Sequence, residues 1–224
     1  MGHIADEIRR IHCELEPYSA ELVAVSKFHP AESIIEAFDA EQRIFGESRV
    51  QELSAKISGL PSDIRWHFIG HLQTNKVRAL MGRTSLIESV DSIRLLQTID
   101  RESERAGVVT KILMQLHVAA EETKTGFSPD ELLDFFASRE YENLRATHIC
   151  GVMGMASNTD DYARVRNDFH TIRAIFDRIK SEVPSDFRGF DIVSMGMSGD
   201  YHIALDEGST MVRIGSQIFG PRQY

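Results

Sequence analysis

The sequence predicts a single (β/α)8 barrel with an extra helix before the first strand. Eight short β-rich runs alternate with helical patterns along 224 residues, so each strand–helix unit has about 28 residues. Most of the runs are nearly continuous in apolar residues, as is typical of parallel strands covered on both faces. A doubly wound open sheet has the same order of elements. We favour the closed barrel because the predicted strands number eight and the chain length fits that fold, which usually requires roughly 200 residues or more.

The predicted strands are short and bounded by turn residues. They span residues 22–27, 43–48, 65–70, 86–91, 111–118, 147–155, 191–197 and 210–216. The extra helix lies near residues 3–14. No linker, repeat or low-complexity stretch divides the chain, so we expect one domain over residues 1–224.

Several helix boundaries are marked by capping residues. Ser128 to Glu131 form a predicted capping box, and Gly107 suits the left-handed residue after a helix. Pro30 suits the first position of a helix, which we expect to bury Ile34, Ile35 and Phe38. The longest predicted helix, near residues 159–180, repeats apolar residues at spacings of four and three. These are Val165, Phe169, Ile172, Phe176 and Ile179.

Composition limits the class of function. The net charge is −9 and the pI is near 5.5, which opposes a nucleic-acid surface because that requires a basic stripe. A small anion site stays open, since a few backbone N–H groups and one arginine can form it. With two cysteines, no signal-peptide pattern and no long apolar run, we expect a cytoplasmic protein outside the membrane. No broad apolar stripe is evident, which favours a monomer.

Lys27 follows the first predicted strand. Barrels of this type place their working residues at the C-terminal ends of strands and in the loops that follow. A lysine here suits a solvated surface group. It also suits a Schiff-base lysine, whose amine is kept partly neutral by burial or by neighbouring cations. Position alone leaves both interpretations open.

A phosphate site is predicted beside the seventh and eighth strands. Barrels often bind phosphate there through backbone N–H groups, and glycines let the backbone approach an anion. Hydroxyl donors in these segments are Ser198, Ser209, Thr210 and Ser216. Strand alternation points Met211, Arg213 and Gly215 one way, and Thr210, Val212 and Ile214 the other. Arg213 within an apolar strand needs a partner, which is either the phosphate or a buried carboxylate.

Other chemistries have weaker support. The histidines lack ligand spacing: His67 and His71 are four apart but lie on a predicted strand, so we expect no metal site. The sequence has no Ser-x-x-Lys, Gly-x-Ser-x-Gly or Gly-x-Gly-x-x-Gly motif, which leaves acyl transfer and dinucleotide binding without an anchor.

Nine short motifs occur in one order from about residue 22 to the C-terminus. They are AVSK at 24–27, FGE at 45–47, VQE at 50–52, WHFIGHLQTNK at 66–76, ETKTGF at 122–127, GVM at 151–153, SMGMSGD at 194–200, GSTMVRIG at 208–215 and IFG at 218–220. This ordered set resembles the YggS/PROSC family of pyridoxal phosphate homeostasis proteins. The family often has asparagine and then tyrosine where this chain has Ser48 and Arg49, which puts a contact of residue 48 with the cofactor ring in doubt. The stretch at 154–156 also departs from commoner forms, so Met155 is expected only to line the site.

The resemblance implies a TIM barrel like the N-terminal domain of bacterial alanine racemase. It implies pyridoxal 5′-phosphate held as an internal aldimine on Lys27, by a Schiff base. The phosphate is then expected beside Ser198, Ser209, Thr210, Arg213, Ile214 and Gly215. Further residues expected to line the site are Ser48, His71 and Met153.

The implied function is vitamin B6 homeostasis: holding the cofactor without turnover and delivering it to pyridoxal-phosphate-dependent apo-enzymes. Racemases of this barrel type complete their site with a β-rich second domain, for which no residues remain here. The alternative is an amino-acid racemase with a half-open site, using His71, His117 or Tyr201 as its second acid/base. A third hypothesis is a phosphosugar aldolase that uses Lys27 as its Schiff-base amine.

Overall fold

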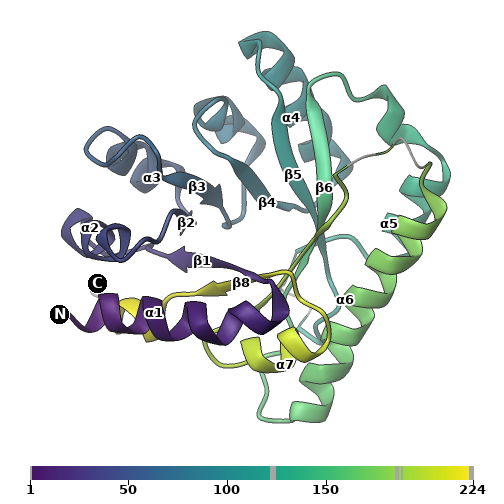
Figure 1. The fold of residues 1–224 in the computed structure, drawn as a ribbon. Helices are drawn as coiled ribbons and strands as arrows, with labels where there is room; N and C mark the ends of the chain where they lie inside the picture. The colour runs from purple at the N-terminus through teal and green to yellow at the C-terminus, as the bar shows by residue number, and fades with distance from the viewer. Residues whose placement is uncertain (1, 122–124, 185–186, 188, 222–224) are drawn as a thin grey trace.

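In the computed structural model the strands close into a parallel barrel in sequence order (Figure 1). The structure describes residues 2–121, 125–184, 187 and 189–221. The strands are β1 (Glu21–Val25), β2 (Ile44–Glu47), β3 (Arg65–Phe68), β4 (Leu86–Val90), β5 (Thr110–Leu116), β6 (Thr147–Gly154), β7 (Ile192–Met197) and β8 (Met211–Ile214). The eight predicted strands are therefore confirmed. The open-sheet alternative is wrong, because β1 pairs with β8 and closes the barrel.

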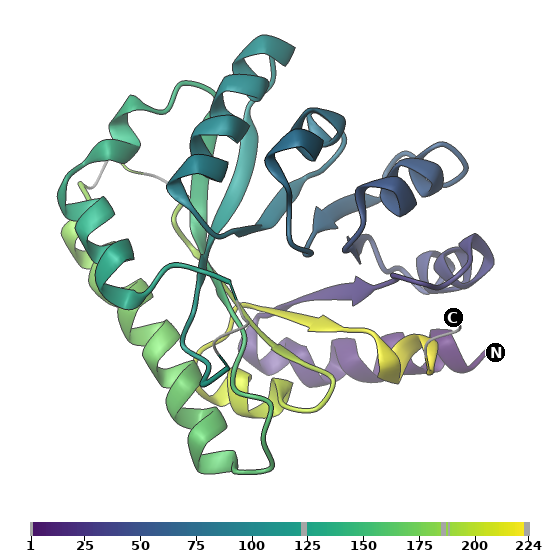
Figure 2. The same ribbon diagram turned by 180° about the vertical axis from the view of Figure 1, so that it is seen from behind.

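Helices surround the strands on the outside (Figures 1 and 2). They are α1 (His3–Leu15), α2 (Ala31–Asp39), α3 (Val50–Ile57), α4 (Ile93–Ala106), α5 (Pro129–Ala137), α6 (Tyr162–Glu182), α7 (Tyr201–Asp206) and α8 (Ser216–Phe219). Short 3-10 segments span Glu16–Tyr18, Thr74–Leu80 and Glu140–Asn143. The extra helix α1 is confirmed, and it packs against β1, α2 and α8.

Two of the predicted helix ends and the apolar face of α6 are confirmed. The Ser128 hydroxyl accepts from the Glu131 N–H at 3.2 Å, and the Glu131 carboxylate accepts from the Ser128 N–H at 2.8 Å, which completes the capping box. Gly107 ends α4 in the left-handed conformation at φ +67°. All five apolar residues predicted for the face of α6 are buried.

The expectation for α2 was wrong in part. Pro30 precedes the helix, which begins at Ala31, and the buried residues of α2 are Ile34 and Ala37. Ile35 is 41% exposed, because successive helical residues lie about 100° apart and Ile35 turns away from the face that Ile34 buries.

The barrel interior has an apolar cluster that includes the first residues of β2, β4 and β8, and we call it the lower apolar layer. Its members are Val23, Ile44, Leu86, Leu113, Cys150, Met153 and Met211. Along β8, Met211 belongs to this layer, whereas Val212 and Ile214 pack in the larger core between strands and helices. The predicted alternation of β8 is therefore confirmed, and it places Arg213 inside the barrel above Met211.

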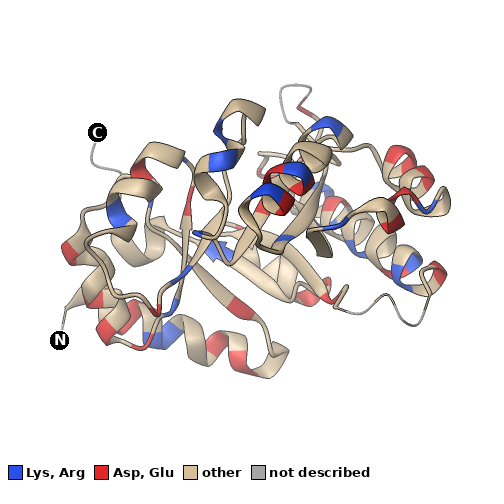
Figure 3. Cartoon of the chain, turned by 90° about the horizontal axis from the view of Figure 1, so that it is seen from above, with Lys and Arg blue, Asp and Glu red and all other residues tan. Residues whose placement is uncertain are grey.

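Acidic and basic residues are intermixed over the outer helices and not gathered on one face (Figure 3). No described helix is long and apolar enough to span a bilayer. Among the described residues, no group of three or more His, Cys, Asp or Glu side chains is placed to hold a metal ion.

Candidate functional site

A cavity of about 280 Å³ opens at the C-terminal end of the barrel. The residues that line it are Val25, Lys27, His29, Ile69, Met155, Met197, Ser198, Gly199, Arg213, Gly215, Ser216 and Gly220. Most follow β1, β7 and β8, so the cavity lies where barrels of this class hold ligands. Its size is near the lower end of small-molecule sites, which begin at roughly 300 Å³.

The pairing of β1 with β8 brings Lys27 beside the start of α8. Ala24 lies opposite Ile214, so the next pair along the two strands is Val25 and Gly215. A Cβ atom on Gly215 would lie 3.1 Å from the Val25 carbonyl oxygen, so glycine lets the two strand ends approach closely. Lys27 stands two residues beyond Val25, and α8 begins directly after Gly215.

The lining of the cavity is suited to an anion. It contains Lys27, Arg213 and His29, and no aspartate or glutamate among its described residues, although the protein carries a net charge of −9. His29 is buried and stacks on Phe219, with the ring centroids 5.1 Å apart. Burial, and then the nearby Lys56 cation, lower the pKa of His29, so its imidazole favours the neutral form.

Arg213 lies in the floor of the cavity. Its guanidinium donates to the Ser194 hydroxyl at 2.6 Å and to the Gly154 carbonyl at 3.0 Å, and lies 3.8 Å from Glu88 Oε2. The sequence left two partners open for Arg213, an anionic ligand and a buried carboxylate. The structure shows the carboxylate and also places Arg213 in the cavity lining.

Glu88 connects this floor to His67. Its carboxylate contacts His67 Nδ1 at 2.7 Å and accepts from the Ser194 hydroxyl at 2.6 Å. Burial acts to raise the pKa of Glu88, but the hydrogen bond and charge of His67, then Arg213 and Ser194, outweigh it and lower that pKa. The carboxylate is therefore charged at neutral pH and balances Arg213.

Ser198 and α8 form the rim beside Lys27. The Ser198 hydroxyl accepts from the Gly215 N–H at 3.3 Å, and Gln217 Nε2 donates to the Ser198 carbonyl at 2.7 Å. The first N–H groups of a helix have no partner within it and attract anions. Ser198, Gly215 and Ser216 thus place hydroxyl and backbone donors at one edge of the cavity.

The structure does not bring Ser209 and Thr210 to this cavity, which corrects the expectation that they lie beside a phosphate. Both precede β8 and lie at its N-terminal end, so Thr210 is on the order of 16 Å along the strand from Gly215. The Ser209 hydroxyl is within 2.8 Å of the Met195 carbonyl, and Thr210 Oγ1 accepts from the Val193 N–H at 2.8 Å. Ile214 directs its side chain into the outer core, so it approaches the cavity only through its backbone.

The three other lining candidates are not among the residues that line this cavity, and they stay predictions. The backbone of Ser48 packs against Gly70. A Cβ atom added at Gly70 would lie 2.2 Å from the Ser48 carbonyl oxygen. The His71 ring is exposed and pairs with Asp91 at 3.0 Å. Met153 is buried in the lower apolar layer, and Met155, two residues further on, lines the cavity.

Sequence reasoning missed His29 as a lining residue. Its signal was its place two residues after Lys27, in the short turn before α2. Within the ETKTGF motif, residues 122–124 lie outside the described residues.

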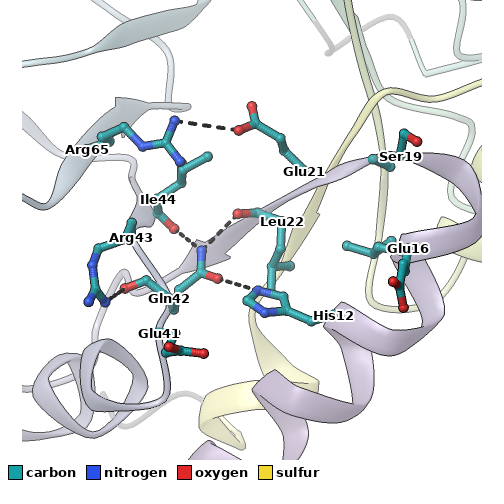
Figure 4. A pocket seen from close by; sticks show the side chains of 12 residues that line it. His12, Glu16, Ser19, Glu21, Leu22, Glu41, Gln42, Arg43, Ile44 and Arg65 are labelled. Carbon is teal, nitrogen blue, oxygen red and sulfur yellow. Dashed lines mark hydrogen bonds and ion pairs between the residues drawn. The ribbon is translucent and has the colours of Figure 1, made fainter.

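A second pocket lies at the opposite, N-terminal end of β1 and β2 (Figure 4). Gln42 dominates it: its amide nitrogen donates to the Leu22 and Ile44 carbonyls at 2.8 and 2.6 Å, and its oxygen lies 2.9 Å from His12 Nε2. These contacts join α1 to two strands. They hold the N-terminal end of the barrel together, where this fold places stabilising residues.

Comparisons with known proteins agree with this architecture. The family described as "Alanine racemase, N-terminal domain" matches residues 1–223. A pyridoxal phosphate homeostasis protein of Aquifex aeolicus (strain VF5) is 37% identical over 207 residues, covering 92% of this chain and 88% of that protein. The protein of the same name from Homo sapiens is 38% identical over 225 residues, covering 94% of this chain and 80% of the human one.

Solved structures of PipY from Synechococcus elongatus PCC7942 are also similar. The structure without PLP matches with a TM-score of 0.90 at 35% identity, and the one with PLP bound with a TM-score of 0.86 at 34% identity. Each match covers 97% of this chain and 100% of PipY. The fold and the cavity thus define an alanine racemase N-terminal-type barrel. Within that class, the chain belongs to the YggS/PROSC family of pyridoxal phosphate homeostasis proteins.

Proposed function

We propose that this chain binds pyridoxal 5′-phosphate in the cavity at the C-terminal end of the barrel and holds it on Lys27. One observation carries the proposal: Lys27, Arg213 and the start of α8 converge on a cavity whose described lining contains no carboxylate, in an acidic protein. The similarity to PipY, solved with PLP bound, supports the same ligand.

Different parts of the lining suit different parts of the cofactor. Ser198 and Ser216 offer hydroxyl donors for the phosphate, and Ser216 at the start of α8 also offers its backbone N–H. Arg213 is held in the floor by Ser194 and Gly154, so its charge is fixed before the ligand arrives. Apolar walls for an aromatic ring come from Val25, Ile69 and Met155.

Bound pyridoxal phosphate supplies an aldehyde, with which a neutral lysine amine condenses to form a Schiff base and water. In the lining, Lys27 is the residue that offers such an amine. It is half-buried, between the apolar wall of β1 and the rim formed by α8. The proposed role of the protein is to keep the reactive aldehyde in this cavity and away from free amines.

The test is an absorbance spectrum of the purified protein before and after borohydride reduction, followed by peptide mapping. We expect a band near the visible edge that reduces onto Lys27. Lys27→Ala should lose the band and keep the fold, because Lys27 lies in a turn after β1. The control Lys180→Ala removes an exposed lysine paired with Asp191 and should keep the band. A protein that takes up no added pyridoxal phosphate would contradict the proposal and favour the aldolase reading.

Arg213→Ala should weaken cofactor retention, because it removes the fixed positive charge of the floor. Retention is measured by dialysis against buffer, with the bound fraction followed by absorbance. An unchanged bound fraction would contradict this role for Arg213.

A homeostasis role without turnover is favoured over the racemase alternative by the positions of the candidate acids and bases. His71 pairs with Asp91, His117 Nε2 lies 3.0 Å from the Glu121 carbonyl, and the Tyr201 hydroxyl donates to Glu14. All three lie outside the lining of the cavity. Loss of the Cα proton of an amino acid in D2O, catalysed by the loaded protein, would favour the racemase.

The role also includes a setting and partners. We propose that the protein acts in the cytoplasm as a monomer and passes the cofactor to pyridoxal-phosphate-dependent apo-enzymes. In the view of Figure 3, acidic and basic residues alternate along the described helices, which is unlike the basic stripe that nucleic acid requires. Recovery of activity by an apo-enzyme mixed with the loaded protein tests delivery, and light scattering after gel filtration tests the monomer.

A further inference from the structure

Three charged side chains gather behind the turn that carries Lys27. Glu47 ends β2 and its side chain is fully buried, whereas Glu52 and Lys56 lie on α3. Lys56 Nζ donates to Glu47 Oε1 and to Glu52 Oε1, each at 2.7 Å. The Lys56 side chain is only 10% exposed. We call Glu47, Glu52 and Lys56 the charged clamp.

The charged clamp bonds to the residues on both sides of Lys27. The Ser26 hydroxyl donates to Glu47 Oε1 at 2.6 Å, and Lys56 Nζ donates to the Ser26 carbonyl at 2.8 Å. On the other side, the Phe28 N–H donates to Glu52 Oε1 at 2.6 Å. The backbone on either side of Lys27 is therefore fixed by charged groups, which make stronger hydrogen bonds than neutral ones.

The clamp holds a backbone conformation that the turn would not adopt without support. Phe28 has φ +67°, in the left-handed region. For a residue with a side chain this conformation costs roughly 1–2 kcal/mol, and it persists only where the surroundings enforce it. The bond from the Phe28 N–H to Glu52 supplies that enforcement directly.

Stability of the fold alone does not explain the clamp. Burying charges is costly, and a buried ion pair is often no more stabilising than apolar residues of the same volume. The contacts made here go to the turn at 26–28, which ends beside the cavity. The clamp therefore determines where the Lys27 side chain leaves the backbone.

We infer that Glu47, Glu52 and Lys56 are positioning residues that aim Lys27 at the aldehyde of the cofactor. This inference rests on the proposed function. In the step concerned, the neutral Lys27 nitrogen attacks the aldehyde carbon, a C=N bond replaces C=O, and the oxygen leaves as water with the two amine hydrogens. Among the described residues, the clamp forms hydrogen bonds to Ser26 and Phe28 and not to Arg213, Ser198 or α8. On this inference the clamp acts mainly on formation of the covalent bond, because its bonds go to the turn at 26–28, and its influence on the lining is the charge of Lys56 near His29.

The test separates these two steps in one set of variants. Glu52→Ala removes the acceptor for the Phe28 N–H, and Glu52→Gln keeps an oxygen there. Lys56→Met removes the link to Ser26, with Lys180→Met, on the surface, as its control. Stopped-flow absorbance after mixing with pyridoxal phosphate measures the rate of covalent bond formation. Titration with pyridoxine 5′-phosphate, which has an alcohol in place of the aldehyde, measures non-covalent affinity.

We expect Glu52→Ala and Lys56→Met to slow bond formation by about tenfold or more, since small misplacements of a reacting group have effects of this order. Affinity for pyridoxine 5′-phosphate should stay within about twofold, and Glu52→Gln should restore much of the rate. Should Lys56→Met fail to fold, the Glu52 pair, half-buried on α3, decides the question.

Wild-type rates in both variants would overturn the inference and leave the proposed function standing. A parallel loss of rate and of pyridoxine 5′-phosphate affinity would also overturn it, because the clamp would then support the whole cavity. A wild-type protein that binds neither pyridoxine 5′-phosphate nor pyridoxal phosphate would contradict the proposed function itself.

Discussion

Replacing Glu88 by glutamine tests the buried charges below the cavity. The substitution keeps the side-chain volume but replaces one carboxylate oxygen of Glu88 by an NH2 group. One of these oxygens accepts from Ser194 and the other contacts His67, so one of the two contacts is lost. It also leaves Arg213 buried and without the anion 3.8 Å away. Removing one member of a buried pair typically costs about 3–5 kcal/mol. At the lower figure, the melting temperature should fall by roughly 6–12 °C for a chain of this size.

The pH dependence follows from the lowered pKa of Glu88. Burial alone would raise this pKa, but His67, Arg213 and Ser194 favour the charged form and bring it below the ordinary value of 4.5. A carboxylate whose folded-state pKa is lowered stabilises the fold above its unfolded pKa and loses that contribution as pH falls through the folded one. The gap in melting temperature between wild type and Glu88→Gln should therefore be full at pH 7 and narrow below about pH 4.5.

Thermal unfolding of cofactor-free protein, followed by circular dichroism from pH 7 to acid, measures this gap. Glu182→Gln is the matched control, because Glu182 is exposed and pairs with Arg178 at 3.0 Å on the surface of α6. Exposed pairs of this kind contribute about 1 kcal/mol or less. A Glu88→Gln protein that melts with the wild type at pH 7, or a gap that does not change with pH, would refute the reasoning.

Three further outcomes are expected. Phe169→Ala should cost about 3–5 kcal/mol in urea unfolding, because Phe169 is fully buried on α6 and its truncation leaves a cavity; a loss below about 1 kcal/mol would show that the site collapses. Ser128→Ala should cost about 1 kcal/mol in the same assay by removing the cap of α5, whereas Ser138→Ala, after the same helix, serves as the control. The His29 imidazole should titrate by NMR below the ordinary 6.5, and a midpoint at or above that value would contradict its burial.

The strands were predictable because their signal is local. Each is a short, nearly continuous apolar run, and β1 and β8 are recognisable without knowledge of their partners. The face of α6 was predictable for the same reason, since helical periodicity is a property of one segment. Closure of the barrel followed from the number of such runs and was confirmed by the pairing of Glu21 with Met211.

The end of β8 that serves the cavity was harder to predict from the motif. The segment at 208–215 spans the whole strand, and hydroxyls and glycines occur at both of its ends. Strand direction decides between them: residues before the strand lie at the N-terminal end of the barrel, as Ser209 and Thr210 do, and Gly215 lies at the other. The motif therefore belongs to a strand that reaches the cavity, but two of its residues, Ser209 and Thr210, lie at the other end of that strand.

The sequence could not predict which side chains of β6 point into the barrel. Cys150 and Met153 both face the lower apolar layer although they are three residues apart, which strict alternation forbids. The cause is an irregularity: Gly151 has φ +150°, and the pairing of β5 with β6 shifts register between Ile112 and Met114. A bulge of this kind re-aims the side chains that follow it.

The charges buried in the strands distinguish the two ends of the barrel. At the N-terminal end, the interior is an apolar layer and Gln42 joins the elements through neutral hydrogen bonds. Toward the C-terminal end, Glu88 and Arg213 pair below the cavity, and Glu47 pairs with Lys56 behind the turn of Lys27. A buried ion pair is often no more stabilising than apolar packing, so stability alone does not account for the concentration of buried ions at one end. The proposed binding of pyridoxal phosphate gives a further reason, since it requires Arg213 in the floor and Lys27 on its turn to be held in place.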